Sequence, residues 1–200
     1  ASISKRPDLS PILDILEEQG DEIFRDADSI ALEIDMDKEI VKRVFAFAEK
    51  YHKPVFAVVS NMSIAVERRD FLRSCACFVC NQQEAGILFS EDYEGKTPAE
   101  LETVLAHHVQ AAALPGIVVT MGEQGAVYAT LDGERGWCPA KRVDVKDTTG
   151  AGDAFFAGVT MGLTYGKTLA ESCTIGARLA ASVICTSENV CPRFLPSEFG

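Results

Sequence analysis

The chain has 200 residues, of which 47% are hydrophobic and 24% charged, and its formal net charge is −11. This composition is typical of one folded domain with a substantial core and not of a disordered chain. Nucleic-acid binding without sequence preference relies on Lys and Arg, so the acidic balance argues against that class of partner. A phosphorylated small molecule is compatible with it, because a few backbone N–H groups are enough to hold an anion.

Neither membrane insertion nor a disulfide framework is expected. No apolar run reaches the roughly 20 residues that cross a bilayer, and the first residues lack the apolar stretch of a signal peptide. The seven cysteines are an odd number, and several lie in apolar stretches (Cys75, Cys77, Cys80, Cys173 and Cys185). We therefore expect reduced thiols in a cytoplasmic protein. The Cys77-x-x-Cys80 pair has no second pair or histidine at ligand spacing, which favours core thiols over a zinc site.

The first half of the chain predicts helices that alternate with strands. Residues 10–20 have an amphipathic helical pattern, and residues 28–34 form a short apolar run typical of a strand. Asp37 can cap the helix that follows. The continuous run 53–59 predicts a strand that is buried on both faces. A helix over 64–73 and a short strand over 75–79 come next.

The second half adds an antiparallel element. Residues 97–113 predict a helix, since Thr97 and Glu100 form a capping box with Pro98 at the first position. A strand is expected over 116–120, then two antiparallel strands over 125–130 and 135–143, and finally helices over 151–165 and 168–184. The second of these two helices is rich in small residues and should pack closely. The pattern predicts a single α/β domain over 1–200, with a mostly parallel sheet and the antiparallel pair at one edge.

Ligands of open α/β sheets bind beyond the carboxyl ends of the strands, so the segments that follow strands deserve most weight. The first is Asp147-Thr-Thr-Gly-Ala-Gly-Asp153, just before a helix. Gly150, Ala151 and Gly152 can turn tightly and, with the unpaired N–H groups of the helix, form an anion hole. Asp153 would then accept the proton of an attacking hydroxyl. Alone, the same residues are also typical of a turn with a capping carboxylate.

Two further segments follow predicted strands. Thr120-Met-Gly122-Glu-Gln-Gly125 has two glycines three residues apart and can be a simple turn between strands. Asn81-Gln-Gln-Glu84 can be a helix start capped by Asn81. Two other phosphate motifs fit the chain poorly. A dinucleotide fingerprint would need Gly or Ala where Phe155 stands, and the run from Gly162 to Lys167 is one residue too short for a P-loop. Lys167 is expected to be exposed between two helices.

These three motifs, in this order, closely resemble those of the PfkB (ribokinase-like) family of carbohydrate kinases. The resemblance extends from about Asp28 to Pro196 and implies a ribokinase-like three-layer α/β/α fold. It implies ATP as cofactor, with Asp153 as general base, and Thr120 and Gly122 near the ATP phosphates, while Gly125 keeps the backbone open. Asn81 would lie near the phosphates and Arg178 near the adenine. Glu84 would help to hold Mg²⁺, which prefers oxygen ligands.

The resemblance also implies a monovalent cation, usually K⁺, beside the anion hole. Asp147 and Thr149 match positions that hold it, and the segment from Ile184 to Arg193 aligns with the rest of the cation loop, including Ser187 and Asn189. The acceptor would be a sugar or nucleoside hydroxyl. Several features resemble the pseudouridine kinases, such as the Lys53-Pro-Val strand, but Val58 and Val59 stand where that subgroup usually has Asp and Pro.

Family members begin with a segment that carries a Gly-Gly substrate motif, an Asp that grips the sugar hydroxyls, the first strands and a small lid. Residues 1–27 do not resemble it. We therefore expect an N-terminally truncated domain with an exposed apolar sheet edge, a homodimer, and little kinase activity from this chain alone. The alternative is a non-catalytic nucleotide-binding or scaffold relative. A dinucleotide-binding dehydrogenase is the third possibility.

Overall fold

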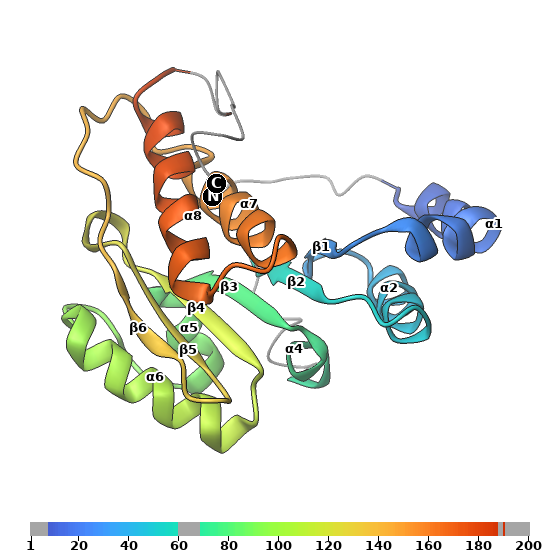
Figure 1. Ribbon diagram of the computed structural model, residues 1–200, viewed down its shortest axis with the longest axis horizontal. Coiled ribbons are helices and arrows are strands. Elements are labelled where there is room, and N and C mark those ends of the chain that lie inside the picture. Colours follow the sequence, from blue (N-terminus) through green and yellow to red (C-terminus); the bar gives the residue numbers. More distant parts are fainter. Residues whose placement is uncertain (1–7, 60–68, 188–189, 191–200) are drawn as a thin grey trace.

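The computed structural model describes residues 8–59, 69–187 and 190, and these build one six-stranded sheet (Figure 1). The strands lie in chain order: β1 (Ile30–Glu33), β2 (Val55–Val58), β3 (Cys77–Asn81), β4 (Gly116–Thr120), β5 (Ala126–Thr130) and β6 (Arg135–Cys138). Pairing is parallel from β1 to β4 and antiparallel from β4 to β6. The expected mostly parallel sheet with an antiparallel edge is confirmed.

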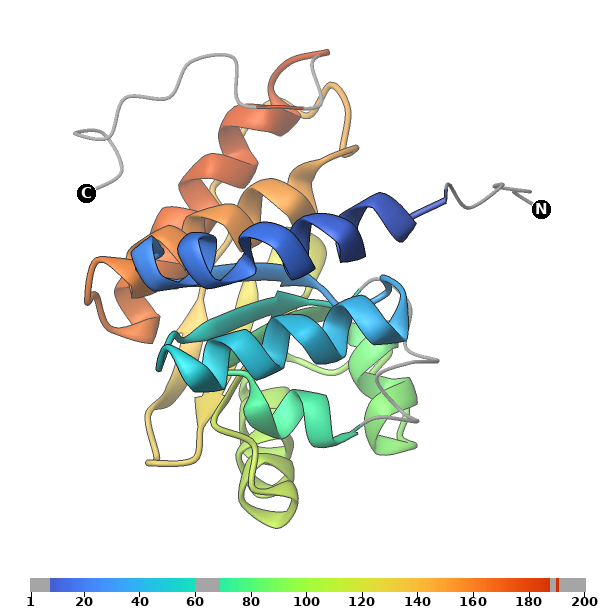
Figure 2. The same ribbon diagram turned by 90° about the vertical axis from the view of Figure 1, so that its right-hand side faces the viewer.

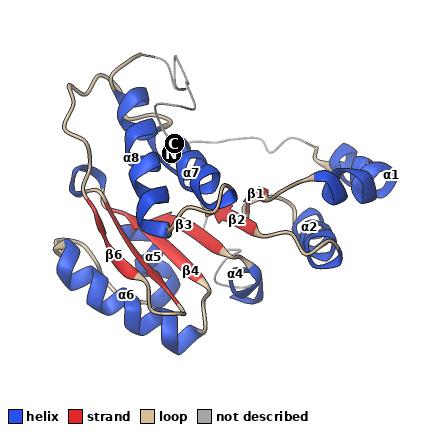
Figure 3. Cartoon of the chain, viewed as in Figure 1, coloured by secondary structure: helices blue, strands red, loops and turns tan. Residues whose placement is uncertain are grey.

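Helices cover both faces of the sheet and make three layers (Figure 3). Alternate strand residues such as Val79 and Val118 pack against α7 (Ala151–Thr164) and α8 (Leu169–Ile184). Their neighbours, such as Cys80 and Val119, pack on the other face against α1 (Ser10–Asp26), α2 (Lys38–Lys50), α4 (Arg69–Ser74), α5 (Gln82–Phe89) and α6 (Pro98–Ala112). This alternation follows from the period of two in a strand.

Close packing of α7 on α8 depends on small residues, as expected. A Cβ atom added to Gly158 would lie 2.6 Å from the Cα atom of Gly176, and one added to Gly176 would lie 2.7 Å from the carbonyl oxygen of Phe155. No real Cβ atom tolerates such contacts, so both positions require glycine. The two helices therefore approach closely enough to hold the start of α7 in a fixed position relative to α8.

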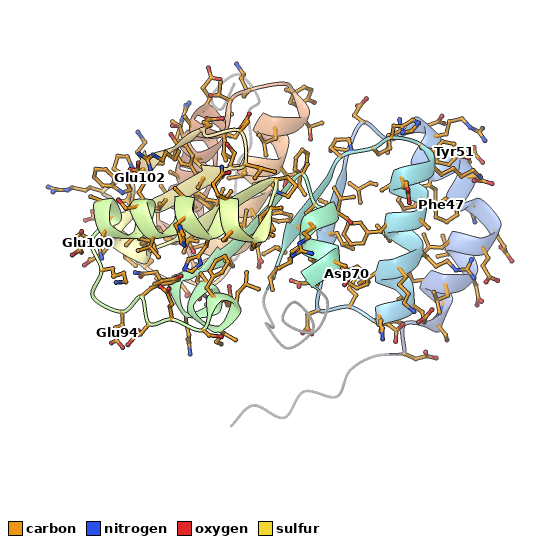
Figure 4. All side chains as sticks on the ribbon, turned by 90° about the horizontal axis from the view of Figure 1, so that it is seen from below. Phe47, Tyr51, Asp70, Glu94, Glu100 and Glu102 are labelled. Atoms are coloured by element: carbon orange, nitrogen blue, oxygen red, sulfur yellow. The ribbon has the colours of Figure 1, made fainter. Side chains whose placement is uncertain are left out.

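Helices α1 and α2 run side by side over one end of the sheet (Figure 2). Gly20 leaves room for the ring of Phe47, which stacks on Phe24 with 4.9 Å between the ring centroids. The Tyr51 hydroxyl donates to Asp21 at 2.7 Å. Figure 4 shows Phe47 on α2 and Tyr51 directly after the end of that helix. The amphipathic pattern predicted for residues 10–20 thus continues to Asp26.

Most predicted elements are confirmed, including the caps of α2 and α6 by Asp37 and by the Thr97–Glu100 capping box. The strand predicted over 135–143 is wrong beyond Cys138. Pro139 follows it and has no N–H to continue the ladder. The strand predicted over 75–79 is displaced, because the Cys75 N–H bonds to the Phe71 carbonyl at the end of α4. Residues 64–68 of the predicted helix lie outside the described residues.

The cysteines of the Cys77-x-x-Cys80 pair are buried in the core, as are Cys75 and Cys173, while Cys185 is half-buried. Burial raises the pKa of the Cys77 thiol to about 12, so it is protonated at neutral pH. Lys167 is exposed between α7 and α8, as expected. Among the described residues, no helix has both the length and the apolar character needed to cross a membrane.

Candidate functional site

The parallel pairing of β3 with β4 brings two of the three motifs together at the carboxyl edge of the sheet. Asn81 and Thr120 are register partners on these strands. The Thr120 hydroxyl donates to the carbonyl oxygen of Cys80 at 3.4 Å. Both strands end here, at the edge where open α/β sheets bind ligands.

The loop between β4 and β5 is a tight turn with two glycines in left-handed conformations. The Met121 N–H donates to the Gly125 carbonyl oxygen at 2.7 Å. Gly125 has φ +96°, and a Cβ atom there would lie 2.1 Å from the carbonyl oxygen of Cys138, so packing against β6 demands glycine. Gly122 has φ +56°, but a Cβ atom there would meet nothing within 4 Å. The backbone at Gly122 is therefore open to a ligand.

The first turn of α7 contains the residues that were predicted to form an anion hole. Gly150 is the N-cap with φ 80°, and its carbonyl oxygen accepts the Ala154 N–H at 2.9 Å. The first N–H groups of a helix have no partner inside it and carry partial positive charge. A Cβ atom on Gly152 would meet no atom within 4 Å, so protein packing does not require glycine there. Asp153 lies on the same turn and is exposed.

A cavity of about 550 Å³ joins the loop after β4 to the start of α7. The loop that connects β6 to α7 runs beside α8 (Figure 1) and supplies part of the wall. The lining residues come from four segments: Thr120, Gly122, Glu123 and Gly125; Ala140, Lys141, Arg142, Val143, Val145 and Thr148; Ala151, Gly152 and Phe155; and Ala177, Ala180, Ala181 and Ile184. This is the size of a small-molecule site.

Parts of this lining escaped prediction from the sequence. Lys141 and Arg142 line the cavity although the segment was assigned to a strand. Two adjacent basic residues between two strand-end motifs, in a chain of net charge −11, were the available signal. The small residues of α8 were predicted to pack closely against neighbouring helices, and the structure shows that some of them also line the cavity. Arg178 is exposed on α8 and does not belong to the lining, so its expected place near an adenine stays a prediction.

A second hollow lies on the other side of the loop after β4 and shares Thr120 and Gly122 with the first. Its remaining lining comes from β3, α5 and the segment that follows α5: Asn81, Gln82, Gln83, Gly86, Ile87, Ser90, Glu91, Asp92, Tyr93 and Glu94. Within the part of the chain that the structure describes, the lining contains three acids and no Lys or Arg. It therefore differs in charge from the first cavity, which has two basic residues and one acid.

Asn81 and Glu84 form a capping box at the start of α5, as the plainer interpretation of these residues predicted. The Asn81 side chain accepts the Glu84 N–H at 2.9 Å, and the Glu84 carboxylate accepts the Asn81 N–H at 2.7 Å. Burial and the negative charge of Glu33 raise the pKa of the Glu84 carboxyl group, and the bond from Asn81 opposes them. A nearby divalent cation would relieve this cost. The oxygen donors of Asn81 and Glu84 are compatible with Mg²⁺.

Some of the residues expected to form a cation loop lie close together. The Asp147 carboxylate accepts the Thr149 N–H at 2.8 Å, and this bond lowers the pKa of Asp147. The Lys146 N–H donates to the Ile184 carbonyl oxygen at 2.8 Å, which brings this loop to the end of α8. Ser187 is exposed, and Asn189 lies outside the described residues. Among the described residues, no group of three or more His, Cys, Asp or Glu side chains could hold a metal ion.

The sequence model of the pfkB family of carbohydrate kinases matches residues 7–192, nearly the whole chain. This chain is a pfkB family member. The predicted resemblance is therefore confirmed at the level of the family, whereas the pseudouridine kinase subgroup is not singled out. The strand-end loops and the α7 N-terminus described above are the parts of the domain in which its three motifs lie.

Two curated relatives and one solved structure illustrate the similarity. The guanosine-inosine kinase of Exiguobacterium acetylicum is 33% identical over 94% of this chain and 61% of its own. The pseudouridine kinase of Escherichia coli K12 is 30% identical over 60% of this chain and 37% of its own. Arabidopsis thaliana ribokinase complexed with ribose and ATP has a TM-score of 0.74 at 22% identity, covering 86% of this chain and 54% of that one. The chain thus spans between a third and two thirds of these kinases.

Proposed function

We propose that this chain is the nucleotide-binding and catalytic part of an ATP-dependent kinase whose acceptor is a hydroxyl group of a nucleoside or sugar. The observation that carries the proposal is the shared cavity. One wall is the open turn at Thr120 and Gly122, and another is the N-terminus of α7 with Gly152 facing empty space. A nucleotide in that cavity would have its phosphates between the open backbone at Gly122 and the positive N-terminal end of α7.

In this proposal the N–H groups of Gly150, Ala151 and Gly152 hold the oxygens of the transferred phosphoryl group. The Ala151 N–H donates to the Thr148 carbonyl oxygen at 3.2 Å in this structure and would turn to the phosphoryl group when the nucleotide binds. Asp153 accepts the proton of the attacking hydroxyl group. The hydroxyl oxygen forms a bond to the γ-phosphorus, and the bond between that phosphorus and the ADP oxygen breaks. Asp153 is exposed on the first turn of α7, where a substrate hydroxyl can reach it. Phosphoryl transfer needs mainly positioning and charge stabilisation, which fixed backbone dipoles supply.

Glu84, with Asn81 beside it, is proposed to help hold Mg²⁺, partly through water. The ion would neutralise phosphate charge when bound. A monovalent cation at Asp147, Thr149 and Ile184 is the second proposed ion. The Asp147 carboxylate stays ionised there because a backbone N–H group lowers its pKa. Its charge and the Ile184 carbonyl are suitable donors for K⁺.

A purine nucleoside is the acceptor that we place first. The similarity to a guanosine-inosine kinase extends over 94% of this chain, whereas the pseudouridine kinase matches 60%. Pseudouridine, ribose and fructose remain in the test panel. We expect the 200-residue chain alone to phosphorylate these acceptors slowly or not at all. Val58 stands where pseudouridine kinases usually have Asp, so this chain has one fewer carboxylate available for Mg²⁺. The expected homodimer stays a prediction.

The proposal is tested by measuring Mg·ATP binding to this chain by calorimetry, and ADP formation by this chain and by a version extended at its N-terminus with the first part of a full-length family kinase. Guanosine, inosine, pseudouridine, ribose and fructose serve as acceptors. We expect ATP binding by both proteins and nucleoside-dependent ADP formation by the extended one. Absence of ATP binding by both would contradict the proposal, and rapid turnover by the short chain would contradict the expected inactivity.

A further inference from the structure

Trp137 lies next to the turn that follows β4, and it is the chain's single tryptophan. Its indole N–H donates to the Gln124 carbonyl oxygen at 2.6 Å. Gln124 ends the 3-10 turn η1 (Gly122–Gln124), between the two glycines of the nucleotide motif. A side chain of β6 thus holds the backbone of a loop that connects β4 to β5. We propose that Trp137 is a positioning residue for nucleotide binding, an inference that rests on the proposed function.

The sheet explains why Trp137 can reach the loop. Thr120 pairs with Ala126 at the base of the turn, and Ala126 pairs with Cys138 on β6. Trp137 pairs with Val127 in the same ladder. The indole therefore starts beside the base of the turn and extends along it. The hydrogen bonds inside the turn, such as that from the Met121 N–H to the Gly125 carbonyl oxygen, set its shape. The bond from Trp137 adds a support from the neighbouring strand, which sets where the turn lies on the sheet.

The turn has a second contact with the same strand. Gly125 packs so closely on the carbonyl oxygen of Cys138 that no Cβ atom fits between them. Gln124 and Gly125 are thus both fixed to β6, one by a hydrogen bond and the other by contact. Gly122, on the opposite side of the turn, has open space around it and lines both cavities. The turn is anchored on its β6 side and leaves its other side for a ligand.

Trp137 itself is poorly suited to a purely structural role. Its side chain is 49% exposed. Its neighbour on β6, Arg135, pairs with Glu102 of α6 at 3.5 Å and ties the strand to that helix independently. Figure 4 shows Glu102 on α6. Loss of the indole N–H should therefore leave the strand in place and release mainly the turn.

The test compares the 200-residue chain with its Trp137→Phe variant in Mg·ATP calorimetry and thermal unfolding, with Tyr165→Phe as a control at another exposed aromatic residue. A net hydrogen bond corresponds to about a threefold to tenfold change in affinity. We expect the dissociation constant for ATP to rise by that factor in Trp137→Phe, with little change in Tm. Saturating ATP should also change the emission of the single tryptophan in the wild-type chain.

Equal ATP affinity of the wild-type chain and Trp137→Phe would overturn this inference alone. A wild-type chain that binds no ATP would overturn the proposed function and this inference with it. If Trp137→Phe unfolds, the benzothienyl analogue of tryptophan, in which sulfur replaces the N–H group, keeps the ring and removes the donor. That chain should show the same loss of affinity, and unchanged affinity would overturn the inference.

Discussion

Asn81 and Thr120 are register partners on the parallel strands β3 and β4, and the Thr120 hydroxyl bonds to the carbonyl oxygen just before Asn81. The relationship places the Asn-x-x-Glu segment and the glycine turn at one edge of the sheet. The turn then lines the same cavity as the first residues of α7. Three segments that are distant in the sequence thus meet at the carboxyl ends of the strands, and each of them yields a prediction.

Asp153→Asn should strongly slow phosphoryl transfer while leaving ATP binding intact. The amide keeps the shape of the side chain but cannot accept the hydroxyl proton, and loss of a general base lowers kcat by about 10²- to 10⁴-fold. ADP formation is measured in the extended protein, and ATP affinity by calorimetry. Asp144→Asn, at an exposed acid of the loop before α7, is the matched control. Unchanged turnover in Asp153→Asn would favour the non-catalytic alternative.

Gly152→Ala and Gly125→Ala should separate ligand binding from folding. A Cβ atom at Gly152 meets nothing within 4 Å. Alanine there should keep or raise stability, since it is the better helix residue by up to about 1 kcal/mol, and should weaken ATP binding about tenfold or more by blocking the phosphate. At Gly125 an alanine Cβ would clash with the Cys138 carbonyl oxygen, and the positive φ is unfavourable for alanine, so the free energy of unfolding should fall by about 2 kcal/mol or more. Urea unfolding and calorimetry measure both effects, and equal ATP affinity in Gly152→Ala would contradict the anion hole.

Glu84 and Glu100 should have opposite effects on the pH dependence of stability, although both belong to capping boxes. Burial raises the pKa of Glu84 in the folded chain. The folded chain therefore binds the Glu84 proton more tightly than the unfolded chain does. The resulting contribution to the free energy of unfolding is greatest below the ordinary Glu pKa of about 4.3 and is lost as pH rises through the pKa of the folded state. Thr97 lowers the pKa of Glu100, so that contribution is present above about pH 4.3 and is lost as pH falls.

Urea unfolding over a pH series measures this difference. Relative to Glu84→Gln, the wild-type chain should lose stability as pH rises from about 4. Relative to Glu100→Gln, it should gain stability over the same range. Added Mg²⁺ should reduce the wild-type loss if Glu84 helps to hold the ion. Parallel pH curves for the two variants would show that the burial of Glu84 has no effect on its protonation.

Replacing Lys141 and Arg142 together by Gln should weaken ATP binding about threefold to tenfold and make it less sensitive to salt. Both residues line the cavity, in a chain whose net charge repels a nucleotide. Adenosine, which has no phosphate, should bind the variant and the wild-type chain equally. Lys146→Gln is the control, because Lys146 is in the same loop but outside the lining. An equal effect of Lys146→Gln would indicate a general charge effect.

The local signals in the sequence were sufficient for most of the elements and for the positions of the three motifs along the chain. Period-two burial, the Thr97–Glu100 capping box and the turn glycines each act within a few residues, so the chain order of strands and helices could be predicted. The predicted end of β6 lay too far along the chain, because Pro139 cannot donate a backbone N–H and ends the ladder after Cys138. The Asn81–Glu84 pair stayed ambiguous, since a helix cap and a phosphate site need the same residues.

The sequence alone determined which residues have the chemistry: two glycine turns, one carboxylate at a helix start and one capping pair after a strand. Tertiary structure decided which of them meet. Register between β3 and β4 sets Asn81 beside Thr120, and close packing of Gly158 on Gly176 fixes the start of α7. The cavity wall from Lys141 and Arg142, and the bond from Trp137 to Gln124, depend on contacts between segments that no local pattern encodes. Local patterns arise from neighbours in the chain, whereas a binding site arises from neighbours in space.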